Sequence, residues 1–133
     1  MMRFIRCRRA IETLEAAITF PIAILAMLAA VNLGMVVYGQ QAVQAAARHG
    51  ARMGSVAQQC AACYASGAAG SVIGADPVVK SPQVSILSPG GVAGSILSVR
   101  VSGKIPNFIG GLAPGLPAEF TVSAEATFRQ EGW

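Results

Sequence analysis

Two patterns of apolar residues divide the chain into an N-terminal and a C-terminal part. Residues 16–39, AAITFPIAILAMLAAVNLGMVVYG, contain no charged side chain, and residues 40–64 are rich in Ala and Gln and contain no proline. After residue 66, Gly, Ser and Pro interrupt the sequence, and apolar and polar residues begin to alternate. The first pattern is typical of helix, and the second is typical of β-strands joined by turns.

The first part predicts one long helix from about Ile11 to Ser66, with Pro21 inside it. Residues 16–39 alone would form a helix of about 36 Å, which is long enough to cross a bilayer core. A cleaved secretory signal has a shorter apolar region of roughly 7–15 residues. We therefore expect residues 11–39 to be a retained transmembrane helix and residues 40–66 to continue it outside the membrane.

The second part, residues 67–133, predicts a loop-rich β-domain with three strands. The positions expected on one face of the sheet are Val84 and Ile86 in the first strand, Leu97, Val99 and Val101 in the second, and Phe120, Val122, Ala124, Ala126 and Phe128 in the third. Such alternation implies an antiparallel sheet with one buried face, which we expect to pack on the C-terminal half of the helix. The stretches AGSVIGADP, KSPQ and residues 106–117 are expected to be loops. The predicted fold class is α+β.

Small residues recur at every fourth position along the predicted helix. They are Ala26, Ala30 and Gly34 in the first half, and Ala42, Ala46, Gly50 and Gly54 in the second. Rows of this kind let helix backbones approach closely in membranes. The alternative is that they only reflect an alanine-rich composition.

Composition and charge narrow the function classes. The chain is 53% hydrophobic and 12% charged, against about 25% charged residues in a typical soluble domain. Four of its ten basic residues lie in the first ten positions, so the remaining six balance the six acids and the net charge of +4 belongs to this basic segment. No basic stripe remains for nucleic acid. The positive-inside tendency places the N-terminus in the cytoplasm and the C-terminal part outside.

Residues for catalysis or metal binding are scarce, and we expect no enzyme, no cofactor, no metal site and no small-molecule substrate. His49 is the single histidine, and no GxxxxGK[ST], HExxH or GxSxG motif occurs. Cys7 lies in the basic leader, which leaves Cys60 and Cys63 in CAAC. In an oxidising compartment this pair is most simply a local disulfide. A thioredoxin-type dithiol has the same spacing but lies at a helix start after a strand, and that context is not predicted here.

Arg48 and Arg52 are four residues apart and therefore share one face of the predicted helix. They are candidates for contacts with lipid headgroups or with another subunit. An acid of the protein's own sheet, such as Glu119 or Glu125, is a third partner, and a solvated basic face is the alternative.

The junction between the basic leader and the apolar helix resembles the signal of type IV pilin-like proteins. The sequence there is Arg8-Arg9-Ala10-Ile11-Glu12-Thr13-Leu14-Glu15. The resemblance implies that a prepilin peptidase cuts after Ala10, that Ile11 becomes the new N-terminus and that Glu15, the fifth mature residue, neutralises the new amine during assembly. The alternative is that Glu15 only interacts with the positive end of the helix dipole.

Further motifs narrow the resemblance to the TadE-like family, pilin-like components of tight-adherence (Flp-type) pilus systems. They are Glu15 with Pro21 six residues later, the block Ala46-Ala47-Arg48-His49-Gly50-Ala51-Arg52, and the end Ala124-Glu125-Ala126-Thr127-Phe128-Arg129. Two positions depart from the family pattern, since Ala10 replaces the commoner glycine and Glu12 adds a second acid.

This resemblance implies a minor pilin or pseudopilin in the bacterial inner membrane that acts in pilus assembly or a related secretion apparatus. Its expected partners are a prepilin peptidase, other pilin-like subunits, the assembly platform and membrane lipid. One alternative is an uncleaved, single-span membrane anchor whose outer β-domain is a binding module. Another is a membrane-bound dithiol oxidoreductase that uses Cys60 and Cys63.

Overall fold

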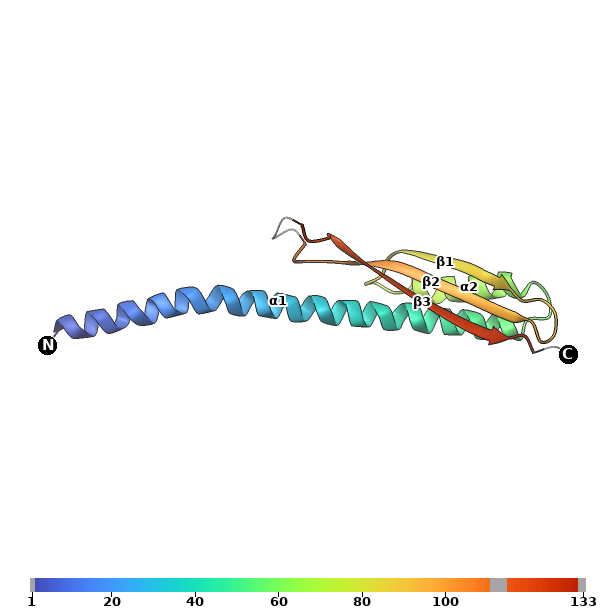
Figure 1. Ribbon diagram of the computed structural model, residues 1–133, viewed down its shortest axis with the longest axis horizontal. Coiled ribbons are helices and arrows are strands. Elements are labelled where there is room, and N and C mark those ends of the chain that lie inside the picture. The colour runs from blue at the N-terminus through green and yellow to red at the C-terminus, as the bar shows by residue number, and fades with distance from the viewer. Residues whose placement is uncertain (1, 111–114, 132–133) are drawn as a thin grey trace.

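The other helix and the sheet pack on one long N-terminal helix. The computed structural model describes residues 2–110 and 115–131, with side chains from residue 11 onward. The elements are α1 (Met2–Ser55), α2 (Ala61–Gly74), β1 (Lys80–Pro89), β2 (Ile96–Pro106) and β3 (Glu119–Arg129). Figure 1 shows α1 as a rod, with the sheet and α2 lying along its C-terminal half. The predicted α+β class, a long N-terminal helix followed by a small antiparallel sheet, is confirmed.

Helix α1 is continuous through Pro21 but ends at Ser55, so the prediction that it runs to Ser66 was wrong. The chain turns over residues 56–60, where the Ala57 N–H donates to the Gly54 carbonyl at 3.2 Å. Cys60 ends this turn with a left-handed φ of 39°. A helix that stops here lets the following alanines fold back onto α1 instead of pointing into water.

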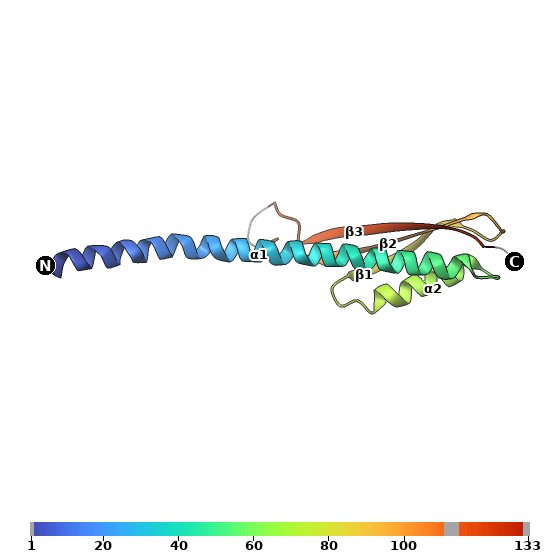
Figure 2. The same ribbon diagram turned by 90° about the horizontal axis from the view of Figure 1, so that it is seen from below.

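Helix α2 includes the AGSVIG residues that the sequence predicted as loop, and that prediction was also wrong. Its buried residues are spaced four apart: Ala61, Ala65, Ala69 and Ile73. Figure 2 shows α2 running back beside the C-terminal part of α1. Glycine within a helix costs up to about 1 kcal/mol relative to alanine, and burial of this small-residue face against α1 offsets that cost.

The sheet has the order β1-β2-β3, and both strand pairs are antiparallel. All three predicted strands are present. β1 starts earlier than expected, at Lys80, and includes KSPQ, which the sequence predicted as loop. Its pairing with β2 is irregular between Lys80 and Gln83, where Ser81 has a φ of 48°. The described residues between Pro106 and Glu119 lie outside the strands, as expected.

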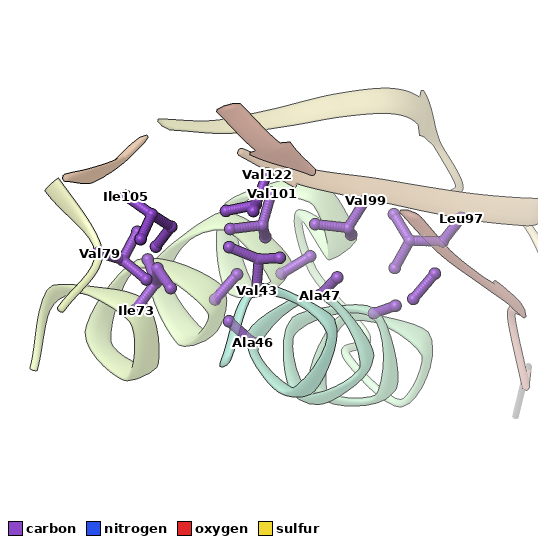
Figure 3. Close-up of a cluster of buried hydrophobic side chains, with 14 residues drawn as sticks. Val43, Ala46, Ala47, Ile73, Val79, Leu97, Val99, Val101, Ile105 and Val122 are labelled. Atoms are coloured by element: carbon purple, nitrogen blue, oxygen red, sulfur yellow. The ribbon is translucent and has the colours of Figure 1, made fainter. Parts of the chain in front are cut away.

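The core lies between the sheet and the C-terminal half of α1, as predicted. In Figure 3, Val43 and Ala47 of α1 lie opposite Val99 and Val101 of β2, and all four are fully buried. The small residues of α1 bring the strands close to the helix backbone. Phe128, expected on the buried face, is instead 38% exposed at the end of β3.

Candidate functional site

The N-terminal half of α1 has a large apolar surface that no other described part of the chain covers. Between Ile11 and Val31 every residue is exposed except Leu28, which is half-buried. This exposed half of α1 is about 30 Å long at 1.5 Å per residue, close to the thickness of a bilayer core. In the described part of the chain, α1 is the one helix long and apolar enough to cross a membrane. It is consistent with a single-pass membrane anchor.

The predicted cleavage site lies within the helical backbone of α1. Ala10 belongs to the residues whose side chains are outside the described part, whereas Ile11 and Glu15 are both exposed. Because they are four residues apart in one helix, Ile11 and Glu15 share a face. Cleavage after Ala10 and the role of Glu15 stay predictions.

The first half of the small-residue row faces outward. Ala26, Ala30 and Gly34 are exposed, and a Cβ placed on Gly34 would meet no atom within 4 Å. These three residues leave the backbone of α1 open to close approach by another helix.

The second half of the row packs against the protein's own α2 and sheet. Ala46, Gly50 and Gly54 are buried. A Cβ on Gly50 would lie 2.7 Å from the Ala65 carbonyl oxygen, and one on Gly54 would lie 2.5 Å from Leu97 Cδ2. Close helix packing therefore occurs here with a helix that the sequence analysis did not predict, and these positions are not available to another subunit.

Arg48 and Arg52 are exposed on α1, and neither forms an ion pair with another described residue. Of the alternatives open for Arg48 and Arg52, pairing with Glu119 or Glu125 does not occur, because those acids have partners on the neighbouring strand. Lys104 Nζ lies 2.9 Å from Glu119, and Arg100 lies 3.1 Å from Glu125. The two strands bring these charges together across the solvent face of the sheet. A contact of Arg48 and Arg52 with lipid or another subunit stays a prediction.

Cys60 and Cys63 are joined by a disulfide, with their Cα atoms 5.3 Å apart. The pair lies at the start of α2, since Cys60 precedes the helix and its carbonyl accepts from the Cys63 N–H at 2.9 Å. The bridge thus lies across the first turn of α2, whereas the sequence had placed it inside a continuous helix. A redox-type helix start follows a strand, and this one follows a helix. Among the described residues, no three His, Cys, Asp or Glu side chains are grouped to hold a metal ion.

Gln130 is a buried polar residue that the sequence analysis missed. Its Nε2 donates to the Ala57 carbonyl at 2.9 Å, and its Oε1 accepts from the Gly91 N–H at 3.2 Å. The adjacent Glu131 N–H donates to the Ser55 carbonyl at 3.1 Å. Gln130 therefore connects the α1–α2 turn, the β1–β2 turn and the end of β3. Nothing in the polar C-terminal sequence indicated this role.

Asn32 is the second missed residue, and a signal for it existed, because it is the one amide side chain in the apolar stretch 16–39. It is 6% exposed, and its Oδ1 accepts from the Phe108 N–H at 3.0 Å. This bond attaches the β2–β3 connection to α1 just beyond the exposed half. The Nδ2 atom is buried without a hydrogen-bond partner among the described residues.

A groove of about 360 Å³ lies beside Asn32, between α1 and the β2–β3 connection. Its walls are apolar and include Ala29, Leu33, Val36, Ile109, Leu116 and Phe120. None of the described residues that line this groove is charged, so it is suited to a hydrocarbon group rather than to a polar substrate.

Comparison with known protein families finds a match within α1. A family model described as TadE-like protein matches residues 12–52. No curated protein and no solved structure matches the chain significantly. The matched segment lies entirely within α1 and includes both its exposed half and the part that forms the core. The predicted resemblance to the TadE-like family is therefore confirmed over residues 12–52.

Proposed function

We propose that this protein is a minor pilin or pseudopilin that acts in the assembly of a tight-adherence, type IV-like pilus or a related secretion apparatus. The family match associates the chain with such pilus systems in general. The observation that carries the finer proposal is the division of α1. One half is an uncovered apolar rod, and the other half is the spine of a folded α+β domain.

The exposed half of α1 would lie in lipid before assembly and among the helices of other subunits afterwards. Both environments keep its apolar side chains out of water. The row formed by Ala26, Ala30 and Gly34 would let the helices pack closely, because lipid gives no hydrophobic drive for helix association and close contact must supply the attraction. The protein thus has a structural role rather than a catalytic one.

Glu15 is proposed as the assembly carboxylate. A charged carboxylate among apolar helices requires a partner of opposite charge. Cleavage after Ala10 would create an ammonium group at Ile11, one helical turn before Glu15, and the same group would be present on each neighbouring subunit. An amine and a carboxylate at this spacing can pair within a subunit or between subunits.

The basic leader explains why an uncleaved chain would stay in the membrane. Its arginines are attracted to the cytoplasmic face, and they cannot easily follow the helix into a hydrophobic fibre. The N-terminus would therefore lie in the cytoplasm and the folded domain outside the inner membrane. The chain would meet a prepilin peptidase first and the assembly platform afterwards.

The first test is the N-terminus of protein recovered from membranes, measured by intact mass with and without a co-expressed prepilin peptidase. A mature start at Ile11 that depends on the peptidase would support the proposal. If Met1 is retained under both conditions, the protein is an uncleaved membrane-anchored module, and the pilin role is wrong.

The second test replaces Glu15→Ala, with Glu12→Ala as the matched control at the same junction. We expect normal cleavage of both variants but loss of pilus incorporation for Glu15→Ala alone, measured by immunoblot of sheared pili. Normal incorporation of Glu15→Ala, or equal loss in both variants, would contradict the specific role of Glu15.

A further inference from the structure

The β2–β3 connection has an apolar sequence, and its described residues lie against the part of α1 predicted to be in the membrane. From Ile105 to Ala118 the sequence has no charged residue. Its described ends extend past the sheet toward the N-terminus of α1, as Figures 1 and 2 both show. Phe108 is 57% exposed and Leu116 is 45% exposed. The large apolar side chains of Phe108 and Leu116 are thus exposed beside the apolar part of α1.

The depth of this contact follows from the rise of the helix. Glu15 and Asn32 are separated by about 26 Å along α1 at 1.5 Å per residue, and the bilayer hydrocarbon core is about 30 Å thick. If Glu15 lies at the inner boundary of the core, Asn32 lies about 4 Å inside the outer boundary. The groove between α1 and the connection then lies at the outer edge of the hydrocarbon.

If the domain lay farther outside the membrane, charged side chains near the start of α1 would have to enter the hydrocarbon core. The residues from Ile11 to Val31 are also long enough to span the core, but Glu12 and Glu15 would then both lie in hydrocarbon. Ionised carboxylates there are costly, whereas embedding Phe108, Ile109 and Leu116 removes apolar surface from water. The deeper position, with Glu15 at the inner boundary of the core and the groove within its outer edge, is therefore favoured for the intact chain.

We propose that Phe108, Ile109 and Leu116, at the two described ends of the β2–β3 connection, seat the domain in the membrane, and that the groove beside Asn32 takes acyl chains of glycerophospholipids from the outer leaflet. Phe108 and Leu116 would enter the hydrocarbon, and the groove walls would contact lipid rather than water. This inference rests on the membrane anchoring in the proposed function, but not on cleavage or on pilus incorporation.

Asn32 acts in this proposal as a positioning residue. Its bond to the Phe108 N–H satisfies a backbone donor that would find no water in the hydrocarbon. The same bond fixes how far along α1 the connection lies. The Nδ2 atom has no hydrogen-bond partner among the described residues, which is costly for a buried donor.

The test measures membrane depth with single-cysteine probes in the full-length chain. Cys7→Ser removes the free thiol, and the Cys60–Cys63 disulfide is left intact. A fluorescent NBD label is attached at Phe108→Cys, at Leu25→Cys in the exposed half of α1, or at Val92→Cys in the β1–β2 connection at the opposite end of the sheet. Each protein is placed in phosphatidylcholine–phosphatidylglycerol vesicles that contain lipids with a nitroxide on the acyl chain.

We expect the label at Phe108→Cys to be quenched several-fold more strongly than the label at Val92→Cys, which is 74% exposed in the native chain. Leu116→Cys should behave as Phe108→Cys does, which guards against a local effect of one substitution. Adding Asn32→Ala should reduce quenching at Phe108→Cys without changing it at Leu25→Cys.

Two outcomes would overturn the inference alone. The label at Phe108→Cys could be quenched no more than at Val92→Cys while Leu25→Cys is quenched, which would place the connection in water. The label could also be shielded from an aqueous quencher without being quenched by lipid, which would show that protein covers the groove. Absence of quenching at Leu25→Cys would overturn both the inference and the membrane anchoring.

Discussion

The two halves of α1 share a row of small residues but have opposite environments. Both are rich in alanine and carry small residues at every fourth position. In the first half these residues face outward, and in the second they lie under α2 and β2. A row of small residues therefore indicates close packing but does not identify the packing partner. The partner depends on whether the rest of the chain folds back over the row.

The sharpest test of this difference replaces one glycine in each half by leucine. Gly50→Leu should destabilise the domain by more than about 3 kcal/mol, because the new side chain meets the backbone of α2 and overpacking of this kind is costly. Gly34→Leu should not destabilise the domain, because the new side chain meets no atom of the protein and leucine favours helix over glycine by up to about 1 kcal/mol. Amide hydrogen exchange of β2 in detergent micelles measures both. Equal protection in the two variants would contradict the division of α1.

The same comparison can be made with leucines. Leu97→Ala should cost about 3 kcal/mol, because a fully buried side chain is removed and a cavity remains. Leu25→Ala, at an exposed position of α1, should change the free energy of unfolding by less than about 0.5 kcal/mol. Urea unfolding followed by circular dichroism of the full chain in micelles checks this pair. A similar loss for Leu25→Ala would mean that the exposed half contributes to the folded core.

Reduction of the Cys60–Cys63 disulfide should have a smaller effect, because the closed loop is short. The chain-entropy relation gives a stabilisation of about 2 kcal/mol for a loop of this size. A Cys60→Ser, Cys63→Ser variant should therefore remain folded, with faster hydrogen exchange concentrated in the first turn of α2. Exchange that rises equally in β3 would instead show that the disulfide holds the whole domain together.

The smallest expected effect concerns the strand ion pairs. Arg100 and Glu125 are about half exposed, and such surface pairs contribute about 0.2–1 kcal/mol. A double-mutant cycle with Arg100→Ala and Glu125→Ala should give a coupling energy in that range that decreases with added salt. A coupling that does not respond to salt would contradict the solvent-screened geometry.

Much of the fold could be predicted because its signals are local. Alternation at Leu97, Val99 and Val101 indicated one buried sheet face, and the structure buries all three. The uncharged run 16–39 indicated an apolar helix, and the motifs around Glu15, Pro21 and Arg48 indicated the family that matches over residues 12–52. Periodicity and motif order are properties of the sequence itself, so no tertiary information was needed.

The remaining features depend on contacts between distant segments. Helix α2 was not predicted as a separate helix because Gly67, Gly70 and Gly74 are residues typical of loops. The helix is stabilised by burial of its alanines against α1, a contact that no local pattern reveals. Glu125 was a candidate partner for Arg48 and Arg52, but the register of β2 and β3 places it opposite Arg100, with which it forms an ion pair. Asn32 and Phe108 meet across 76 positions of the sequence. The long apolar helix, the three strands and the family likeness could be predicted, because short-range patterns and motifs encode them. The folded chain sets where α1 ends, which half of it is covered and which group its buried amide binds. These features depend on which surfaces meet after the chain folds back, and no local pattern encodes that.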